Sequence, residues 1–382
     1  MTRLRIAFLS SLDSTSRRAF SGTLYFMSQA LEKHCGSVVH LGPAHSRIAA
    51  ADERINRVVR PLFGREVLYG QSLAAAREYR LIFEKRLRED EPFDLIFAPA
   101  ASTQIAMLNT TIPILYASDA TFALTRDRLH SYKRISSASA SAANDIEQRA
   151  ITKAAAATYP SRWAADSALN DYGANPDCVS VVPWGANMDR IPAADKIWPS
   201  KSGEGCSLIF LGVHWELKGG PIAYAATELL RQRGVNATLT VCGSVPPNGL
   251  NAEWLKVIPL LNKQNPVEEQ RLSDLLLHSN FLILPTRFDC FGIAFCEASA
   301  HGTPSLGSDT GGVGGAIADG KSGYLLPLTA GPQAYADLIQ AIWSDRERYR
   351  KLVATSRQHY EEQVNWDSWG VEMRKIVASL MS

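Results

Sequence analysis

Twelve short apolar runs, separated by longer stretches of helical character, recur along the whole of this 382-residue chain. Short apolar runs of this kind are typical of buried parallel strands, and their alternation with helices predicts an α/β architecture with doubly wound sheets. Because six runs fall in each half, we predict two Rossmann-like domains, each with its own parallel sheet. The runs cover residues 5–10, 37–42, 93–100, 112–118, 155–161, 178–185, 206–212, 237–243, 256–261, 280–285, 303–308 and 324–328.

One segment between the two halves breaks this rhythm. Residues 186–206 are rich in proline, glycine, serine and charge and show no clear period, so we predict a linker there. The first domain is accordingly placed at residues 1–190 and the second at 191–360. The Ala/Ser-rich tract 136–143 leaves two interpretations open, the start of a helix or a mobile loop.

The composition excludes several classes of protein. Hydrophobic residues make up 46% and charged residues 20% of the chain, as in ordinary globular proteins. No apolar run approaches the ~20 residues that a membrane-spanning helix needs. The first residues, 1–13, have an apolar core too short for a signal peptide, so we interpret them as a buried strand and predict a cytoplasmic protein. The six cysteines are scattered, which favours buried free thiols over disulfides or a metal site.

Basic residues are unevenly distributed, although the net charge is only +2. A solvated helix face is one interpretation of their clustering, and attraction to an anionic membrane surface or a phosphorylated acceptor is the other. Peripheral membrane contact through the first domain therefore stays open as a hypothesis. Aromatic residues do not alternate with the basic ones, so we predict no nucleic-acid partner. The cluster comprises Arg47, Arg54, Arg57, Arg60, Arg65, Arg77, Arg80, Lys85, Arg86 and Arg88.

Two acids, Asp289 and Glu297, lie on either side of a predicted strand-to-helix junction in the second half. The run 280–285 predicts the strand, and residues 295–302 predict a helix that ends at a glycine. Such junctions at the carboxyl ends of parallel strands are where open α/β sheets bind ligands, and helix N-termini favour anions such as phosphate. The two acids would then flank a bound phosphosugar rather than act as a glycosidase acid and base.

Two further junctions have the same character. Lys218 lies just before a helix predicted to begin near Pro221, where a mobile cation beside backbone donors suits a diphosphate leaving group. Gly22 precedes an amphipathic helix after the first strand, and a glycine there lets backbone approach a ligand closely. A solvated lysine and a simple loop glycine are the alternative interpretations.

Residues 315–322, with the sequence GAIADGKS, match the Walker A pattern of nucleoside triphosphatases. A Walker A loop lies between a strand and a helix, whereas a strand-like run, 324–328, follows this match. We therefore reject a triphosphatase. The nearby tandem glycines, Gly311 and Gly312, are interpreted as a loop that passes close to a ligand or to the neighbouring helix.

Motifs of other reaction classes are missing from the sequence. It contains no G-x-S-x-G elbow, no H-E-x-x-H zinc motif, and no G-x-G-x-x-G at the first helix of either half. No D-x-D occurs to hold a divalent cation on a diphosphate, so its charge would be neutralised by Lys218 and helix N-termini. We expect neither a metal nor a cofactor.

The segment from Asp289 to Glu297 resembles the E-x7-E motif of the retaining GT-B glycosyltransferases of family 4, with Asp in place of the first Glu. Residues 210–220, FLGVHWELKGG, resemble the family's strand and loop that carry a donor-phosphate lysine. The segment 311–328 resembles its later glycine-rich segment, and the NWDSWG at 365–370 resembles its terminal segment. The resemblance spans nearly the whole chain and implies a GT-B fold, with residues 361–382 crossing back to the first domain.

The resemblance implies a role for each matching residue. As catalytic residues, Asp289 would hydrogen-bond hydroxyls of the donor sugar and Lys218 would stabilise the departing diphosphate. Glu297 would bind the nucleotide ribose. Other donor-binding groups would be backbone amides and glycine loops, at Phe291, Gly292, Ile293, Gly311, Gly312, Gly22 and Thr23. Asp119 would line the acceptor side.

Two departures from the family pattern stand out. The family often has Arg after the strand glycine, but this chain has Val213 and His214, so one phosphate cation is either missing or supplied by His214. The shortened acid, Asp289, would shift the donor preference or weaken catalysis. The implied reaction is transfer of a hexose from a UDP- or GDP-sugar to a hydroxyl acceptor, lipid-linked or polysaccharide, with retention of anomeric configuration. A nucleotide-sugar-binding scaffold and a sugar-nucleotide epimerase are the alternatives.

Overall fold

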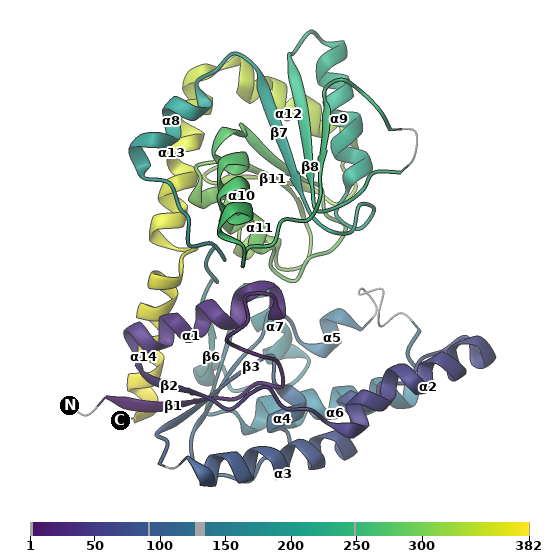
Figure 1. Cartoon of the computed structure of the whole chain (residues 1–382), viewed down its shortest axis with the longest axis vertical. Helices are drawn as coiled ribbons and strands as arrows, with labels where there is room; N and C mark the ends of the chain where they lie inside the picture. Colours follow the sequence, from purple (N-terminus) through teal and green to yellow (C-terminus); the bar gives the residue numbers. More distant parts are fainter. Residues whose placement is uncertain (1–2, 91, 127–133, 248–249, 382) are drawn as a thin grey trace. The chain divides into compact units, whose positions relative to one another are not determined.

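The computed structural model describes residues 3–90, 92–126, 134–247 and 250–381 (Figure 1). The chain divides into two compact units, one formed by Met1–Val182 with Trp369–Ser382 and the other by Pro183–Ser368. Each unit is built on a six-stranded sheet. Each apolar run predicted as a strand overlaps a strand of the structure, as expected of short β-prone runs that are flanked by polar turns and pair in parallel sheets.

The sheet of the first unit has the strand order β2-β1-β3-β4-β5-β6, and all of its pairings are parallel. The chain places β2 on one side of β1 and β3 on the other. Loops after β1 and β3 therefore diverge, which makes this the switch point of the sheet, where ligands of such folds bind. The strands are β1 (Leu4–Phe8), β2 (Gly36–His40), β3 (Leu95–Pro99), β4 (Ile114–Ala117), β5 (Ala156–Tyr159) and β6 (Val179–Val181).

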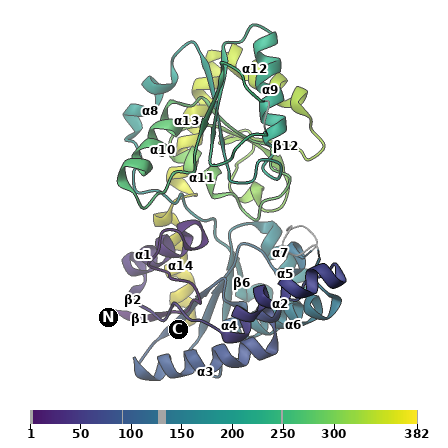
Figure 2. The ribbon, with the colours of Figure 1, turned by 45° about the vertical axis from the view of Figure 1, so that its right-hand side comes forward.

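Helices cover both faces of this sheet (Figure 2). Four of them begin at a serine whose side-chain oxygen accepts a hydrogen bond from the backbone N–H three residues later, a cap worth about 1 kcal/mol each. The four caps are Ser46, Ser72, Ser136 and Ser161. The tract 136–143 is thus the start of a helix. The helices are α1 (Thr23–His34), α2 (Arg47–Phe63), α3 (Leu73–Glu89), α4 (Ser102–Ile105), α5 (Phe122–Thr125), α6 (Ser137–Lys153) and α7 (Arg162–Asn170).

The second unit has a parallel sheet of order β12-β11-β10-β7-β8-β9. The chain runs outward from β7 through β8 to β9 and then returns to the other side of β7 with β10. The switch point therefore lies between β7 and β10. The strands are β7 (Cys206–Leu211), β8 (Ala237–Cys242), β9 (Leu255–Ile258), β10 (Phe281–Leu284), β11 (Ser305–Asp309) and β12 (Gly323–Pro327).

In this second unit α9 and α12 lie side by side on one face of the sheet, and α8, α10 and α13 lie on the other (Figure 2). As predicted, α9 has a proline in its first turn. A strand, β12, follows the Walker-like segment, which agrees with the rejection of a triphosphatase. The helices are α8 (Ala194–Lys201), α9 (Gly220–Gln232), α10 (Pro266–His278), α11 (Ile293–Ala300), α12 (Pro332–Ser344) and α13 (Arg346–Glu362).

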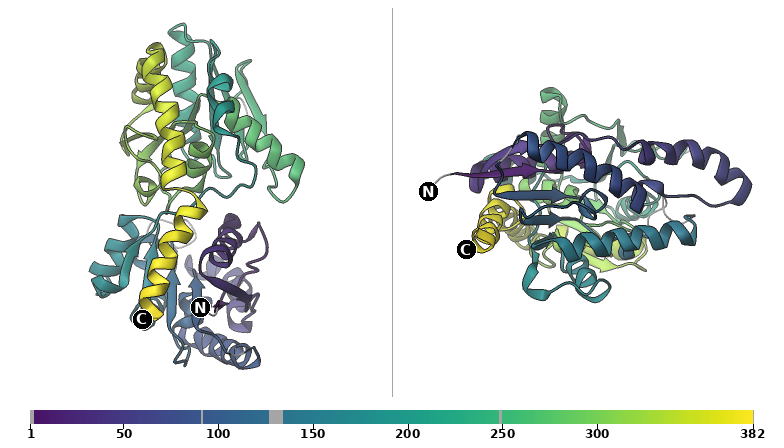
Figure 3. Two further views of the ribbon diagram at one scale, coloured as in Figure 1. Left: turned by 90° about the vertical axis from the view of Figure 1, so that its left-hand side faces the viewer. Right: turned by 90° about the horizontal axis from the view of Figure 1, so that it is seen from below.

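The last helix, α14 (Trp366–Met381), follows α13 and returns the chain to the first unit (Figure 3). Trp369 is 1% exposed, and its ring meets Phe97 of β3 edge-on at 6.0 Å. A Cβ atom on Gly370 would lie 2.4 Å from the ring of His34 in α1, so only glycine lets the two helices approach this closely. The apolar and small residues of α14 thus become part of the first core.

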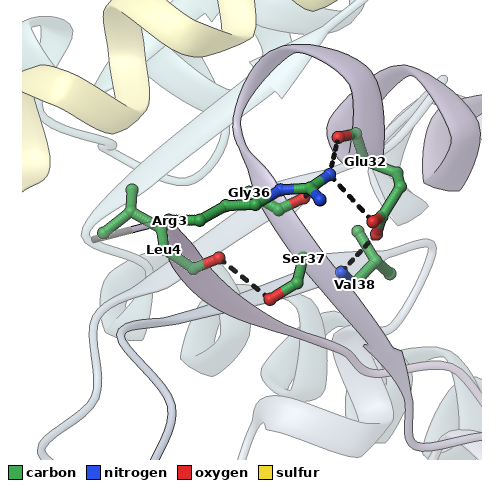
Figure 4. Close-up of polar contacts among 6 residues, drawn as sticks. All are labelled: Arg3, Leu4, Glu32, Gly36, Ser37 and Val38. Carbon is green, nitrogen blue, oxygen red and sulfur yellow. Dashed lines mark hydrogen bonds and ion pairs between the residues drawn. The ribbon is translucent and has the colours of Figure 1, made fainter. Parts of the chain in front are cut away.

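Polar contacts fasten the outer strand β2 to its neighbours (Figure 4). Glu32 of α1 accepts hydrogen bonds from the guanidinium of Arg3 at 2.8 Å and from the backbone N–H of Val38 at 2.6 Å. The Ser37 hydroxyl donates to the carbonyl of Leu4 at 3.2 Å. These contacts tie β1, α1 and β2 together at the edge of the sheet, where strand pairing alone leaves one side of β2 open.

The segment predicted as a linker contains regular structure. Residues 194–201 form α8, which belongs to the second compact unit. Its last residue, Lys201, is fully buried and donates to three backbone carbonyls at the C-terminal end of α10 and to the Thr303 hydroxyl, at 2.6–3.2 Å. The side chain of Lys201 thus donates to carbonyls that the end of a helix leaves unsatisfied. A short helix with an internal proline, Pro199, gives little periodic signal, which is why the sequence suggested irregular structure.

Cys206, Cys242 and Cys296 are buried free thiols, and Cys35, Cys178 and Cys290 are partly exposed. Over the described part of the chain, none of the helices combines the length and the apolar character that crossing a membrane requires.

Candidate functional site

The loop after β7 and the loop after β10 meet at the switch point of the second sheet. Lys218 ends the first loop and Asp289 lies in the second, and Lys218 Nζ is 2.5 Å from Asp289 Oδ2. Their side chains are 19% and 16% exposed, so water only partly screens the ion pair. The structure therefore brings together the two residues predicted to be catalytic.

Tandem glycines give the Lys218 loop its shape. Gly219 has φ +79°, and a Cβ atom there would lie 2.1 Å from the carbonyl oxygen of Pro285. A Cβ atom on Gly220 would lie 2.2 Å from the ring of Trp215. The loop therefore rests directly on the exit of β10, and the backbone N–H of Lys218 closes it by donating to the carbonyl of His214 at 2.9 Å. Larger residues at either glycine would push Lys218 away from the switch point.

Asp289 is fixed by a second glycine pair. Gly312 donates its N–H to the carbonyl of Asp289 at 3.0 Å. Gly311 has φ +57°, and a Cβ atom there would lie 2.1 Å from the same carbonyl oxygen. The close approach expected of these glycines is therefore to the loop that carries Asp289.

The helix that follows, α11, begins beside the Asp289 carboxylate. Gly292 is its N-cap with φ +92°, and a Cβ atom there would lie 3.5 Å from Asp289 Oδ2. The N-cap residue is a glycine and so has no capping side chain, and Ile293 is the first residue of the helix. Phe291 is 2% exposed and packs edge-on against Trp184 at 5.8 Å, which anchors the turn. Backbone N–H groups and the positive end of a helix thus lie next to the ion pair.

Glu297 lies one turn further along α11 and forms a second ion pair that the sequence did not suggest. Its Oε1 is 2.6 Å from Nζ of Lys263, and the side chains are 7% and 19% exposed. Lys263 belongs to the loop between β9 and α10, and the sheet order places β7 and β8 between β9 and β10. The pair therefore reaches across the carboxyl ends of β7 and β8.

A signal for Lys263 was present in the sequence. Lys263 precedes Pro266, the first residue of α10, by three residues, and Lys218 precedes Pro221 by the same spacing. A lysine at this distance before a helix N-terminus can reach the sheet edge in both cases. The spacing that indicates Lys218 as a phosphate-binding lysine therefore also indicates Lys263.

The other expected cation lies outside this arrangement. His214 is in the loop after β7, and its side chain is exposed, while its carbonyl accepts the hydrogen bond from Lys218. Over the described residues, no three His, Cys, Asp or Glu side chains come together in a way that could hold a metal ion.

In the first unit, Gly22 and Thr23 lie at the switch point between β1 and β3. Gly22 caps α1 with φ +88°, and Thr23 is the buried first residue of that helix. The two residues before Gly22, Phe20 and Ser21, also have left-handed backbone, with φ of 50° and 58°. Such conformations in residues with a Cβ atom cost about 1–3 kcal/mol each and concentrate at ligand sites.

Asp119 follows β4 and is half-buried. Its charge contributes to a raised pKa at Glu147, a 5% exposed carboxyl on α6 that accepts a hydrogen bond from the Tyr116 hydroxyl at 3.1 Å. Burial is the main cause, and it raises the pKa of Glu147 from 4.5 to about 7.

A carboxyl whose pKa is higher in the folded state stabilises the fold below its unfolded pKa, and that stability is lost as the pH rises through the folded value. Between pH 4.5 and pH 8 the free energy of unfolding should therefore fall by about 3 kcal/mol through Glu147 alone. Glu147→Gln should remove this fall and make the protein more stable than wild type at pH 8.5. Urea denaturation at pH 5 and pH 8.5 measures it, with Asp145→Asn on the exposed side of α6 as control. Equal stabilities of Glu147→Gln and wild type at pH 8.5 would contradict it.

Comparison with known proteins finds a family model that covers the segment containing both ion pairs. The family model for glycosyl transferases group 1 matches residues 200–359, which include both ion pairs. A D-inositol 3-phosphate glycosyltransferase of Jonesia denitrificans is 28% identical over 229 residues, covering 54% of this chain and 52% of the relative. One from Frankia alni is 30% identical over 187 residues, covering 45% and 46%. The chain thus spans about half the length of the curated relatives it matches.

Solved structures match over nearly the whole chain. A sucrose-phosphate synthase from Thermosynechococcus elongatus superimposes with a TM-score of 0.69 at 16% identity, covering 99% of each chain. Anabaena HepE in complex with UDP gives a TM-score of 0.66 at 12% identity, covering 99% of this chain and 100% of the other. WaaG, a glycosyltransferase involved in lipopolysaccharide biosynthesis, gives 0.60 at 14% identity, covering 98% and 99%. The chain has the GT-B fold, and residues 200–359 match the family of glycosyl transferases group 1.

Proposed function

We propose that this protein transfers a hexose from a nucleoside-diphosphate sugar to a hydroxyl acceptor with retention of anomeric configuration. The observation that carries the proposal is the pair of lysine–carboxylate contacts, Lys218–Asp289 and Lys263–Glu297, at the switch-point edge of the second unit. Two partly buried cations and two acids beside a helix N-terminus match a ligand that carries both a diphosphate and sugar hydroxyls.

Lys218 is proposed to bind the diphosphate. In the ion pair its charge is neutralised by Asp289, and a diphosphate carries more negative charge than one carboxylate. The diphosphate therefore competes for the ammonium group, and Asp289 becomes available to accept hydrogen bonds from hydroxyls of the donor sugar. Sugar binding is then coupled to phosphate binding, because both depend on opening one ion pair.

The reaction needs no carboxylate nucleophile. The bond between the sugar C1 and the diphosphate oxygen breaks, and the bond between C1 and the acceptor oxygen forms on the same face. The departing diphosphate oxygen takes the acceptor's proton. Negative charge grows on the diphosphate as the bond breaks, so the Lys218 ammonium and the N–H groups at the start of α11 stabilise the transition state more than the ground state. Metal independence is part of the proposal.

Glu297 is proposed to bind the ribose hydroxyls, with Lys263 holding its carboxylate in place. UDP is the first candidate among the nucleotides, because the fold neighbour HepE was solved in complex with UDP and also with UDP-glucose. The roles implied for Gly22, Thr23 and Asp119, and a phosphate contact by His214, stay predictions.

The donor proposal is tested by thermal unfolding with UDP, GDP, ADP and CMP in the presence of EDTA. A nucleotide at 100 times its dissociation constant adds about 2.7 kcal/mol to the free energy of unfolding, so its effect is easily measured. We expect stabilisation by one nucleoside diphosphate without metal. Stabilisation that disappears with EDTA would contradict metal independence, and no stabilisation by any of them would contradict the donor site.

We expect Lys263→Ala to weaken binding of that nucleotide by about 10- to 100-fold, because removing the lysine leaves Glu297 as a buried unpaired charge facing the ligand. The affinity for inorganic pyrophosphate, which has no ribose, should change by less than about threefold. This difference between the two ligands is expected because Glu297 is proposed to bind the ribose. Isothermal titration with both ligands measures the difference, and Lys263→Arg should restore much of the nucleotide affinity. Equal losses for both ligands would show that Lys263 contacts the diphosphate instead.

A further inference from the structure

One side of α2 is fully engaged with the segment that follows it, residues 64–71. Asp52 accepts hydrogen bonds from two backbone N–H groups of that segment at 2.6 and 2.8 Å. The side-chain amide of Asn56 accepts from the backbone N–H of Val67 at 2.7 Å and donates to its carbonyl at 2.8 Å. Arg60 pairs with a glutamate there at 2.8 Å. Because these three side chains recur every four residues, they define one face of the helix, and it is the face held against the protein.

The rest of the helix surface combines apolar and basic residues. Val58, Leu62 and Phe63 are 59%, 70% and 71% exposed, and Arg54 and Arg57 are exposed next to them. Arg54, Val58 and Leu62 follow one another at four-residue spacing, so they share a face away from the engaged one. We call these five residues the α2 surface. Figure 3 shows the C-terminal half of α2 extending beyond the rest of the first unit.

The basic cluster noted in the sequence therefore has two parts. On α3, Arg86 donates to two backbone carbonyls near the end of β2, and Arg80 and Lys85 each face a glutamate four residues further on at 3.8 and 3.6 Å. Arg86 thus supports the fold, whereas the two ion pairs lie at the surface and contribute little to it. On α3 a single large exposed apolar side chain, Leu81, lies among the exposed cations, whereas on α2 the exposed arginines lie beside three large exposed apolar side chains, which is not the pattern of a merely solvated helix face.

We propose that the α2 surface binds an anionic lipid bilayer. Exposed apolar side chains next to arginines suit the boundary between headgroups and acyl chains, where Val58, Leu62 and Phe63 leave water and the arginines meet lipid phosphates. A second copy of the chain fits less well, because a two-fold contact through this surface would bring arginines of both copies together. The inference does not depend on the donor chemistry proposed above.

Flotation of the full-length protein with vesicles tests the proposal. Vesicles of phosphatidylcholine alone are compared with vesicles containing 30% phosphatidylglycerol, a composition chosen here for the test, at low and at high salt. The wild type should float with the anionic vesicles at low salt, and the bound fraction should fall at high salt because arginine attraction is screened. Failure of the wild type to float with the anionic vesicles would overturn the proposal.

Two variants separate the two parts of the surface. Val58→Ser/Leu62→Ser/Phe63→Ser should lower the vesicle partition coefficient at least tenfold, and Arg54→Gln/Arg57→Gln should remove the preference for anionic lipid. The matched controls lie on α3. Leu81→Ser replaces a side chain that is 62% exposed and is the control for the serine variant, and Arg77→Gln/Arg88→Gln is the control for the glutamine variant. Both controls should float like the wild type.

Circular dichroism and stabilisation by the nucleotide confirm that each variant is folded, so loss of flotation is distinguished from loss of the donor site. Equal flotation of the triple-serine variant and the wild type would overturn the proposal. A second result would also overturn it: light scattering shows that the wild type is a dimer and the triple-serine variant a monomer, while the two proteins float equally with vesicles. The α2 surface would then join two copies of the chain.

Discussion

Replacing Lys218 by alanine should lower the rate of sugar transfer by about 10²- to 10³-fold, the loss typical of removing one preorganised charge stabiliser. The physical reason is that the ammonium group, 2.5 Å from Asp289 in this structure, becomes the partner of the departing diphosphate. The rate is measured as release of the nucleoside diphosphate from the donor sugar, at saturating donor so that kcat is separated from KM.

The matched control is Lys256→Ala, an exposed lysine on β9 of the same unit. It removes the same charge and should leave kcat within about twofold of wild type, as expected of a surface substitution. Both variants should unfold at wild-type urea concentrations. A Lys218→Ala protein that retains wild-type kcat would show that another group bears the leaving-group charge.

Replacing Lys201 by methionine should lower the free energy of unfolding by about 3 kcal/mol or more, because several buried acceptors lose their donor at once. Lys201 is fully buried and is surrounded by three backbone carbonyls and the Thr303 hydroxyl. Burial holds the pKa of this lysine well below its ordinary value, and no carboxylate is among these hydrogen-bond partners. Methionine fills similar space but donates no hydrogen bond.

Urea denaturation measures this loss, with Lys196→Met as control. Lys196 is on the same helix, α8, but exposed, so the same substitution should change the free energy of unfolding by less than about 0.5 kcal/mol. Equal stabilities of the two variants would show that the end of α10 is satisfied without Lys201.

Much of this fold was predictable because its signals are local. Each strand is a short apolar run, and the helix caps, such as Ser136, lie within one turn of the residues they bind. The pairing of Lys218 with Asp289 followed from two local signals at neighbouring strands, both at the edge where parallel sheets bind ligands.

The missed features depend on contacts between distant residues. Lys263 and Glu297 are 34 positions apart, and the strands that precede them, β9 and β10, are separated in the sheet by β7 and β8, so the sequence does not indicate that the two side chains meet. Lys201 and Thr303 are 102 positions apart, and nothing near Lys201 in the sequence indicates the end of α10. The sequence also did not show which residues of the basic cluster support the fold. The carbonyls that accept hydrogen bonds from Arg86 lie more than 40 positions away in the sequence.

The most direct test of the central claim is release of nucleoside diphosphate by the wild-type protein from UDP-glucose, UDP-galactose, UDP-N-acetylglucosamine and GDP-mannose, in EDTA, with water and a panel of sugar and inositol-phosphate acceptors. We expect release from one donor, faster with an acceptor than with water alone, and lost in Lys218→Ala. Binding without release would instead indicate a nucleotide-sugar-binding scaffold, and conversion of the donor to another nucleotide sugar without release would indicate an epimerase. Either result would contradict sugar transfer by this protein.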